Sequence, residues 1–475
     1  MRTGTFVPYA NWIAAGFAVV CALAFSFHAV AGAALLMAPL VFLLLIHRTM
    51  AVWRTMMFLS SIGMSYFPPP IGPALCWALL LLCLAGCWLE HLSEGQELEW
   101  GDRRIWICIA GWVVWGILST YNSLNPLASI KEIIRYIFSF GVLLTYINWL
   151  RRFGQIQTMV RWCEIMAVAV AMVCIADAFL WALDGVVIQA MVAEPMSRVK
   201  GNYAPTFSEL GAIIAAIVPI TFAFLMTSSP KRSPIRFFTV LIMLFGVILS
   251  TSRASALAAV CGVAVVLFLF ASRRVKILMI TGVVGVNALG SILLTVKYGS
   301  LVTGVIHNLS GRNLLWAAAV RAVSEHPLFG IGPGCWATWL PTRYFTIDFL
   351  MGDMHGNTFA LTPTLLGGEA HNLFFTKAAE MGLPSLAWIA AIFLSWGACA
   401  YSAIKGLPRG WARTLTVGCF ASMVGLTVRC FFENGPIIGR GRGSEVVLVW
   451  FIAAIPLVIQ KIIRSHEAAP GEVLS

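Results

Sequence analysis

The sequence predicts an all-α protein that crosses a membrane many times. Of its 475 residues, 60% are hydrophobic and only 11% are charged, and the mean hydropathy is +0.87. Soluble domains average about 45–50% apolar and about 25% charged residues, so this chain is not one of them. Apolar runs recur along most of its length, and about 20 apolar residues are enough to cross a bilayer. Such runs are expected to be helices, because lipid cannot satisfy an exposed backbone.

The apolar runs are numerous enough for about 12–14 transmembrane helices. The N-terminus imitates a signal peptide, but a second apolar run follows at once, so we expect an uncleaved first pair of helices. The total depends on this tight pair and on the weak third run. The predicted spans are 10–27, 29–46, 50–66, 72–89, 105–120, 131–149, 160–182, 209–228, 235–250, 255–271, 277–297, 384–403, 412–432 and 444–463.

The basic loops set the orientation of these spans. The net charge of +12 falls mostly in short loops between spans, which indicates cytoplasmic loops rather than a nucleic-acid partner. Both termini are then expected on the cytoplasmic side. Three regions result: transmembrane helices over 1–297, a large outer loop over 298–383, and transmembrane helices over 384–475. The basic loops contain Arg151, Arg152, Lys231, Arg232, Arg273, Arg274, Lys405, Arg409, Arg413 and Lys461.

The large outer loop is expected to form a helical lid over the outer ends of the spans. Ser310 is a candidate N-cap for a helix over Arg312–Glu325, with Trp316, Val320 and Val323 on one side. A glycine-rich turn follows at 326–334. No strand precedes this turn, so it does not match a dinucleotide-binding fingerprint.

A short helix is predicted just before the span that begins near 384. His371 and Asn372 open it, and Gly382-Leu-Pro384 ends it. We expect the helix to rest on the membrane surface. The helix dipole disfavours imidazolium at His371, so the ring is expected to be neutral and able to accept a proton. The alternative is that His371 only caps the helix. Its predicted apolar face contains Leu373, Phe374, Ala378 and Met381.

Several basic residues fall on the outer side, against the positive-inside bias. Arg253 is the sharpest example, because a guanidinium at membrane depth costs about 2.5 kcal/mol or more unless it finds an anion. Arginine also binds phosphate oxygens with two N–H groups. Each of these residues could instead snorkel to headgroups or pair with a carboxylate such as Glu209 or Glu433. Their gathering near a histidine favours an anion site. The set is Arg198, Lys200, Arg253, Arg312, Arg440 and Arg442.

The remaining polar residues predict no cofactor and no metal site. Asp348, Asp353 and His355 lie close in sequence, but they lack a metal-ligand spacing. Lys377 and Glu380 are spaced to pair along the short helix.

The order of these residues resembles the O-antigen ligase and polymerase superfamily of bacterial envelope glycosyltransferases. The resemblance covers roughly residues 198–435, and the N-terminal half is similar only as a run of spans. The stretch 340–368, with Asp353-Met-His355-Gly, departs from the family pattern, and the spans slightly exceed its usual dozen. The marks are Arg198-x-x-Gly201, Ser252-Arg253, Ser310-Gly-Arg312 with Trp316, Pro327–Gly334, His371-Asn372, Glu380-x-Gly382 and Phe432-Glu433.

The resemblance implies a transfer reaction on the periplasmic face of the bacterial inner membrane. The donor would be a glycan on undecaprenyl diphosphate, and the acceptor a hydroxyl of lipid A-core or of another glycan. His371 would be the catalytic base, and Arg253, Arg312 and Arg198 would bind the diphosphate. The transfer would be metal-independent and would invert the anomeric carbon. The supporting residues would be Asn372, Glu380, Lys200, Arg440 and Arg442.

Two other functions stay open at this point. A polymerase or a protein O-oligosaccharyltransferase of the same superfamily cannot be separated from a ligase by sequence. A transporter of lipid-linked glycans is the non-enzyme alternative. It would predict pseudo-symmetric halves and ionisable residues near the bilayer midplane, whereas the sequence contains no repeat and places its conspicuous polar residues at one surface.

Overall fold

The computed structural model describes residues 49–50, 53, 71–95, 97–183, 207–250, 252–277, 281, 312–343, 369–434 and 443–467. The regular secondary structure in these ranges is helical, which confirms the predicted all-α class. The predicted runs 10–27 and 29–46 lie outside the described residues, as do nearly all of 50–66 and 277–297. The total of about 12–14 spans therefore stays a prediction.

The other ten predicted spans each form a helix with closely matching bounds. They are α4 (Ile71–Ser93), α5 (Arg103–Thr120), α6 (Pro126–Trp149), α7 (Phe153–Leu183), α9 (Phe207–Met226), α10 (Ser233–Leu249), α11 (Arg253–Phe270), α19 (Pro384–Gly406), α20 (Trp411–Arg429) and α21 (Gly443–Glu467). Five segments of described helix are long and apolar enough to cross a membrane: Phe153–Ala176, Arg253–Phe270, Pro384–Gly406, Trp411–Arg429 and Val446–Ile463. The protein is therefore a multi-pass membrane protein.

The helix starts follow ordinary capping chemistry. The Asp102 carboxylate accepts a hydrogen bond from the Arg104 backbone N–H at 2.8 Å and begins α5. Asn125 caps α6 in the same way through Ala128, and Pro126 occupies the first helical position, where its missing N–H is not needed.

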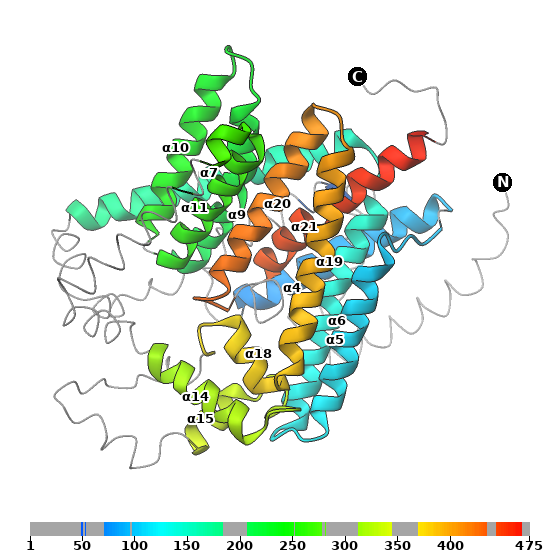
Figure 1. Ribbon diagram of the computed structural model, residues 1–475, viewed down its shortest axis with the longest axis vertical. Helices are drawn as coiled ribbons and strands as arrows, with labels where there is room; N and C mark the ends of the chain where they lie inside the picture. Colours follow the sequence, from blue (N-terminus) through cyan, green and yellow to red (C-terminus); the bar gives the residue numbers. More distant parts are fainter. Residues whose placement is uncertain are drawn as a thin grey trace, which may run out of the picture.

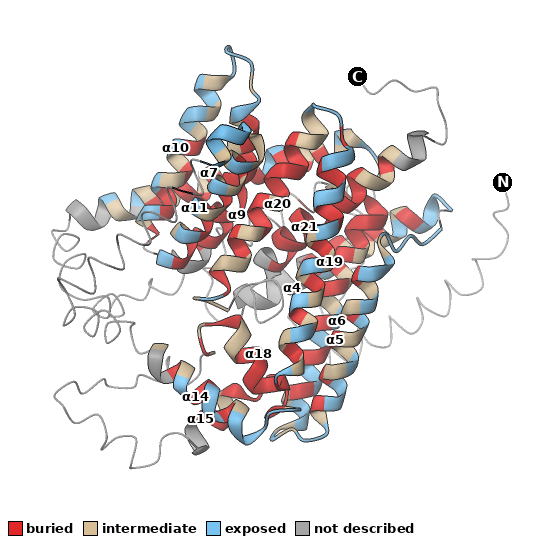
Figure 2. Ribbon diagram, in the orientation of Figure 1, coloured by how far each residue is buried: buried red, intermediate tan, exposed pale blue. Residues whose placement is uncertain are grey.

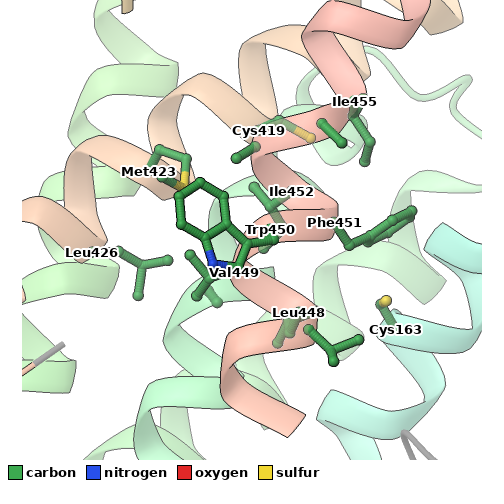
Figure 3. Close-up of a cluster of buried hydrophobic side chains, with 14 of the residues drawn as sticks. Cys163, Cys419, Met423, Leu426, Leu448, Val449, Trp450, Phe451, Ile452 and Ile455 are labelled. Carbon is green, nitrogen blue, oxygen red and sulfur yellow. The ribbon is translucent and has the colours of Figure 1, made fainter. Parts of the chain in front are cut away.

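The bundle is built around α21. Helices α7, α9, α10 and α11 gather on one side, α4, α5, α6 and α19 on the other, and α20 and α21 lie between them (Figure 1). From Val446 to Ile459, α21 is buried on every face (Figure 2). Its side chains pack with Cys163 of α7 and with Cys419, Met423 and Leu426 of α20 (Figure 3). A helix that is apolar all round belongs in such an interior.

The helices at the periphery of the bundle expose apolar side chains, as expected for a lipid-facing surface. On α5, Trp112 points inward and is fully buried, whereas Ile107, Val114 and Ile117 are exposed. This outward apolar stripe would be unusual on a soluble monomer.

Glycines bring α9, α11 and α20 into close contact. A Cβ on Gly425 of α20 would lie 2.3 Å from the Ala258 carbonyl oxygen of α11, and one on Gly262 would lie 2.4 Å from Pro219 of α9. Small residues allow helix backbones to approach closely inside a membrane. The first residues of α11 and the last residues of α20 are thereby held together at one end of the bundle.

Three short helices form a layer at one end of the bundle: α14 (Arg312–Glu325), α15 (Trp336–Arg343) and α18 (Leu373–Met381) (Figure 1). The bounds of α14 match the prediction, although Ser310 lies outside the described residues. The predicted face is confirmed in part: Trp316 contacts Ala370 and Phe375, and Val323 packs on the buried cluster, but Val320 is exposed. The fully buried face is made mostly of small residues, which allow a close approach to α18: it contains Leu315, Ala318, Ala319 and Ala322.

Candidate active site

The site begins at the N-terminus of α18. Asn372 caps this helix, because its Oδ1 accepts a hydrogen bond from the Phe375 backbone N–H at 3.0 Å. His371 is therefore the residue before the cap and does not cap the helix itself. Its backbone has φ +50°, a left-handed conformation that costs a residue with a side chain on the order of 1 kcal/mol. This backbone conformation makes the chain change direction at His371, before the helix begins.

The His371 ring faces a carboxylate that the sequence analysis treated only as a possible arginine partner. Nδ1 of His371 lies 3.0 Å from Oε2 of Glu433. The side chain of His371 is 39% exposed, whereas that of Glu433 is 16% exposed. The Nδ1 edge of the imidazole therefore contacts a largely buried carboxylate, while the side chain of His371 remains partly exposed.

Glu433 is itself held by Arg312. One terminal nitrogen of the Arg312 guanidinium lies 2.6 Å from Oε1 of Glu433, and the other donates to the Phe432 carbonyl at 2.7 Å. Burial works to raise the pKa of Glu433, but the hydrogen bond from His371 and the charges of His371, Arg312 and Arg429 outweigh it. The pKa of Glu433 is therefore below its usual value, and the group is a carboxylate at neutral pH.

The ionised Glu433 determines which ring nitrogen can react. A carboxylate cannot donate a hydrogen bond, so Nδ1 of His371 must carry the proton. In the neutral ring, Nε2 then has the free lone pair, as in catalytic histidines oriented by a carboxylate. The sequence attributed the neutral ring to the helix dipole. In the structure, the carboxylate at Nδ1 selects the tautomer.

Backbone and side-chain hydrogen bonds join the N-terminal end of α18 to the segment after α20. The Leu373 N–H donates to the Cys430 carbonyl at 2.9 Å, and the Asn372 amide donates to the Phe431 carbonyl at 2.8 Å. Thr376 also contacts Asn434 at 3.1 Å, and Asn434 in turn contacts Glu369. These contacts set the position of His371 relative to Glu433.

The C-terminal end of α18 is capped by the glycine-rich turn at 326–334. The last carbonyl groups of a helix lack partners within it. Here the Ile331 and Gly332 N–H groups donate to the Ala379 and Glu380 carbonyls at 3.0 and 2.9 Å.

This turn can approach α18 so closely only because it is rich in glycine. Gly330 has φ +67°, and a Cβ there would lie 2.4 Å from the Glu380 backbone. Gly382, with φ +76°, follows the helix and has no room for a Cβ beside the Leu328 carbonyl. The turn therefore supports α18. From the sequence, these residues were a mark of the family resemblance and did not match a dinucleotide-binding site.

The predicted arginines are only partly brought together. Arg312 joins His371 through Glu433. Arg253 is the exposed first residue of α11, beside the cap residue Ser252. Four predicted residues, Arg198, Lys200, Arg440 and Arg442, lie outside the described residues.

Arg429 is a site residue that the sequence analysis missed. It ends α20, is buried, and has Nε 3.3 Å from the Ser255 hydroxyl of α11. Its charge also reaches Glu433. Arg429 thus lies between the start of α11 and the His371 side of the site. The sequence does contain a signal for this residue, because arginine is rare within an apolar run such as 412–432. The run was interpreted only as a transmembrane span.

The predicted pair of Lys377 and Glu380 is confirmed, with Nζ and Oε2 2.9 Å apart. The helix that bears it was expected to rest on a membrane surface, and this was wrong. Most of α18 is buried beneath α14 and the glycine-rich turn.

No three histidine, cysteine, aspartate or glutamate side chains within the described residues form a group that could hold a metal ion. Asp348, Asp353 and His355 lie outside these residues. Metal independence therefore stays a prediction.

Comparison with known proteins finds a match to one family model. Residues 238–390 match the family model for O-antigen ligase. The matched region contains Arg253, Arg312 and His371, and ends before Glu433. No curated protein sequence matches the chain significantly. The match covers less than half of the chain, and over residues 238–390 it confirms the resemblance of the motifs to the O-antigen ligase and polymerase superfamily.

Proposed function

We propose that the protein moves a glycan from an undecaprenyl-diphosphate carrier to an acceptor hydroxyl, as an O-antigen ligase does, and that His371 is the general base. The observation that carries this proposal is the arrangement of Arg312, Glu433 and His371. A covered carboxylate holds Nδ1 at 3.0 Å and leaves Nε2 free to take a proton. A base of this kind fits transfer to a hydroxyl, which must lose its proton as it attacks.

The reaction balances as a single displacement. Nε2 of His371 takes the proton of the acceptor hydroxyl, and the oxygen forms a bond to the anomeric carbon. The bond from that carbon to the carrier phosphate breaks, and its electron pair leaves with the undecaprenyl diphosphate. Attack opposite the leaving group inverts the anomeric carbon. The imidazolium that forms is stabilised by the Glu433 carboxylate.

The leaving diphosphate needs cations, and we assign this role to arginines at the outer end of the bundle. Arg253 is exposed there, and Arg198 is the further residue that the family resemblance implies. The two terminal nitrogens of Arg312 already contact Glu433 and the Phe432 carbonyl. A guanidinium has five N–H donors, so Arg312 retains donors for a phosphate oxygen while it holds Glu433. Arginine in place of a metal ion can stabilise the developing charge.

Replacement of Arg253 or Arg312 by lysine should lower transfer about 10²-fold, because lysine keeps the charge but loses the two-pronged geometry. Each variant should still be produced in the membrane and show a normal thermal unfolding midpoint. Arg321→Lys is the matched control, since Arg321 lies on the same α14, is exposed, and pairs with Glu325 rather than with Glu433. Normal rates in both the Arg253→Lys and Arg312→Lys variants would rule out the diphosphate role and leave the two arginines as structural ion-pair partners.

The transfer assay itself tests the proposed function. Purified protein in detergent or vesicles receives an undecaprenyl-diphosphate-linked glycan and one acceptor at a time, with a chelator present. We expect a new covalent glycan–acceptor product with lipid A-core, and no effect of the chelator. Product only with a second lipid-linked glycan indicates a polymerase, and product only with a protein indicates a protein O-oligosaccharyltransferase. Movement of the donor across vesicles without any covalent product supports the transporter and refutes the proposal.

The proposed reaction also requires a site on the periplasmic face of the bacterial inner membrane. The alternating basic loops place both termini in the cytoplasm and the loop 298–383 outside. A reporter that is active only in the periplasm should therefore work when fused at Ser310 and fail at Ser475. Activity of that reporter at Ser475 contradicts this topology.

A further inference from the structure

A cluster of charged side chains is buried under α18, on a different face from His371. Lys377 of α18 has a side chain only 2% exposed. Its Nζ lies 2.8 Å from the Tyr136 hydroxyl, 2.9 Å from Glu380 and 3.4 Å from Glu132. We call these four residues, Lys377, Tyr136, Glu380 and Glu132, the Lys377 cluster. Two of them belong to α6 and two to α18.

Lys377 is protonated in this cluster, and its positive charge faces carboxylates. Burial by itself lowers the pKa of Lys377, but the neighbouring Glu380, Tyr136 and Glu132 raise it, and the result is above the usual lysine value. Glu132 has a second cation, because Arg135 lies 3.0 Å away and reaches solvent on the far side. The two carboxylates of the cluster therefore face two cations, Lys377 within the cluster and Arg135 beside it.

Stability alone does not account for this arrangement. Taking an ion out of water costs several kcal/mol, and buried ion pairs can often be replaced by apolar side chains of similar volume with little loss. A buried ionic cluster does, however, strongly favour one alignment of its elements, because any other leaves a charge without a partner. Such clusters are best attested as devices that specify register.

The register in question is that of α18, the helix that begins directly after His371 and its neighbour Asn372. A shift of one residue turns a helix by about 100°, which would move Lys377 away from Glu132. Thr376, the residue before Lys377, contacts Asn434 in the segment after α20. The C-terminal end of α18 is capped by the glycine-rich turn, and α14 packs on the helix as well. The Lys377 cluster adds a charged contact toward α6, which opposes rotation about the helix axis.

We propose that the Lys377 cluster is a positioning element for His371: it sets the rotation of α18 so that Nδ1 meets Glu433 and Nε2 faces the acceptor. The proposal rests on the proposed function, since it assigns these residues to the same transfer reaction. None of them touches substrate. A displacement of about 1 Å at a reacting group can lower a rate about 10²-fold, so the cluster affects kcat more than KM.

The test removes the charges while keeping the volume. A triple variant, Glu132→Gln with Lys377→Met and Glu380→Gln, leaves no buried ion without a partner. We expect a thermal unfolding midpoint near the wild-type value, an unchanged KM for the lipid-linked donor, and a kcat lower by at least about tenfold. The matched control is Arg321→Met with Glu325→Gln, which removes an exposed pair from α14 and should leave kcat unchanged. A folded triple variant with a kcat within about twofold of wild type overturns the proposal.

If the triple variant does not fold, a smaller substitution tests the same proposal. Tyr136→Phe removes one hydroxyl from the Lys377 cluster and keeps the ring. Diethyl pyrocarbonate modifies the His371 ring, and mass spectrometry measures the rate of this modification. The rate depends on how the ring is positioned, and it can be measured without any glycan. We expect both this rate and kcat to change in Tyr136→Phe, and unchanged values of both overturn the proposal. If wild-type protein transfers no glycan, the proposed function fails, and the modification rates alone test the positioning.

Discussion

His371→Gln lowers glycan transfer by about 10²–10⁴-fold, the contribution expected from a general base. Glutamine keeps a hydrogen-bonding group beside Glu433 but cannot take the proton of the acceptor hydroxyl. Membrane insertion and donor binding should persist, because Asn372 rather than His371 caps α18. The measurement is initial rate against donor concentration with purified protein, and the loss should appear in kcat.

The matched control for this variant is His326→Gln. His326 is exposed at the end of α14, so its side chain can change without touching the site. Transfer by His371→Gln at the wild-type rate would show that the histidine is not the base.

Glu433→Gln should produce the second large loss, about 10²-fold or more, through the wrong tautomer. A glutamine amide can donate to Nδ1, which moves the ring proton to Nε2 and removes the lone pair that the reaction needs. Arg312 also loses its anionic partner at 2.6 Å. An unchanged kcat would contradict the role of Glu433.

The same variant should alter the pH dependence of stability. Because the folded-state pKa of Glu433 lies below its usual value of 4.5, the carboxylate stabilises the folded protein. This stabilisation is fully present above the unfolded-state pKa and is lost as pH falls through the lower, folded-state pKa. Wild-type protein should therefore lose thermal stability more steeply than Glu433→Gln as pH falls below about 4.5. Parallel unfolding curves for the two proteins would argue against an ionised, paired Glu433.

Hydrophobic patterning accounts for how well the helices could be predicted. Ten apolar runs became helices with nearly the predicted bounds, because a span must satisfy its backbone internally whatever its neighbours are. The helix Arg312–Glu325 was also predicted correctly. Its buried side was predicted only in part: Val323 packs on the buried cluster, whereas Val320 is exposed and Ala318, Ala319 and Ala322 are buried. Which side of such a helix is buried depends on the partner helix against which it packs.

For the site, the sequence by itself determined the chemistry of the individual residues: a histidine before a short helix, a lysine and a glutamate one turn apart, and arginines on the outer side. Only the tertiary structure decided the partners. Glu433 and Arg429 come from the end of α20, and both Glu132 and Tyr136 come from α6, far from His371 and Lys377 in the chain. Local periodicity contains no information about such contacts, because they form only when separate helices pack. The same packing buried α18, which composition alone had assigned to a membrane surface.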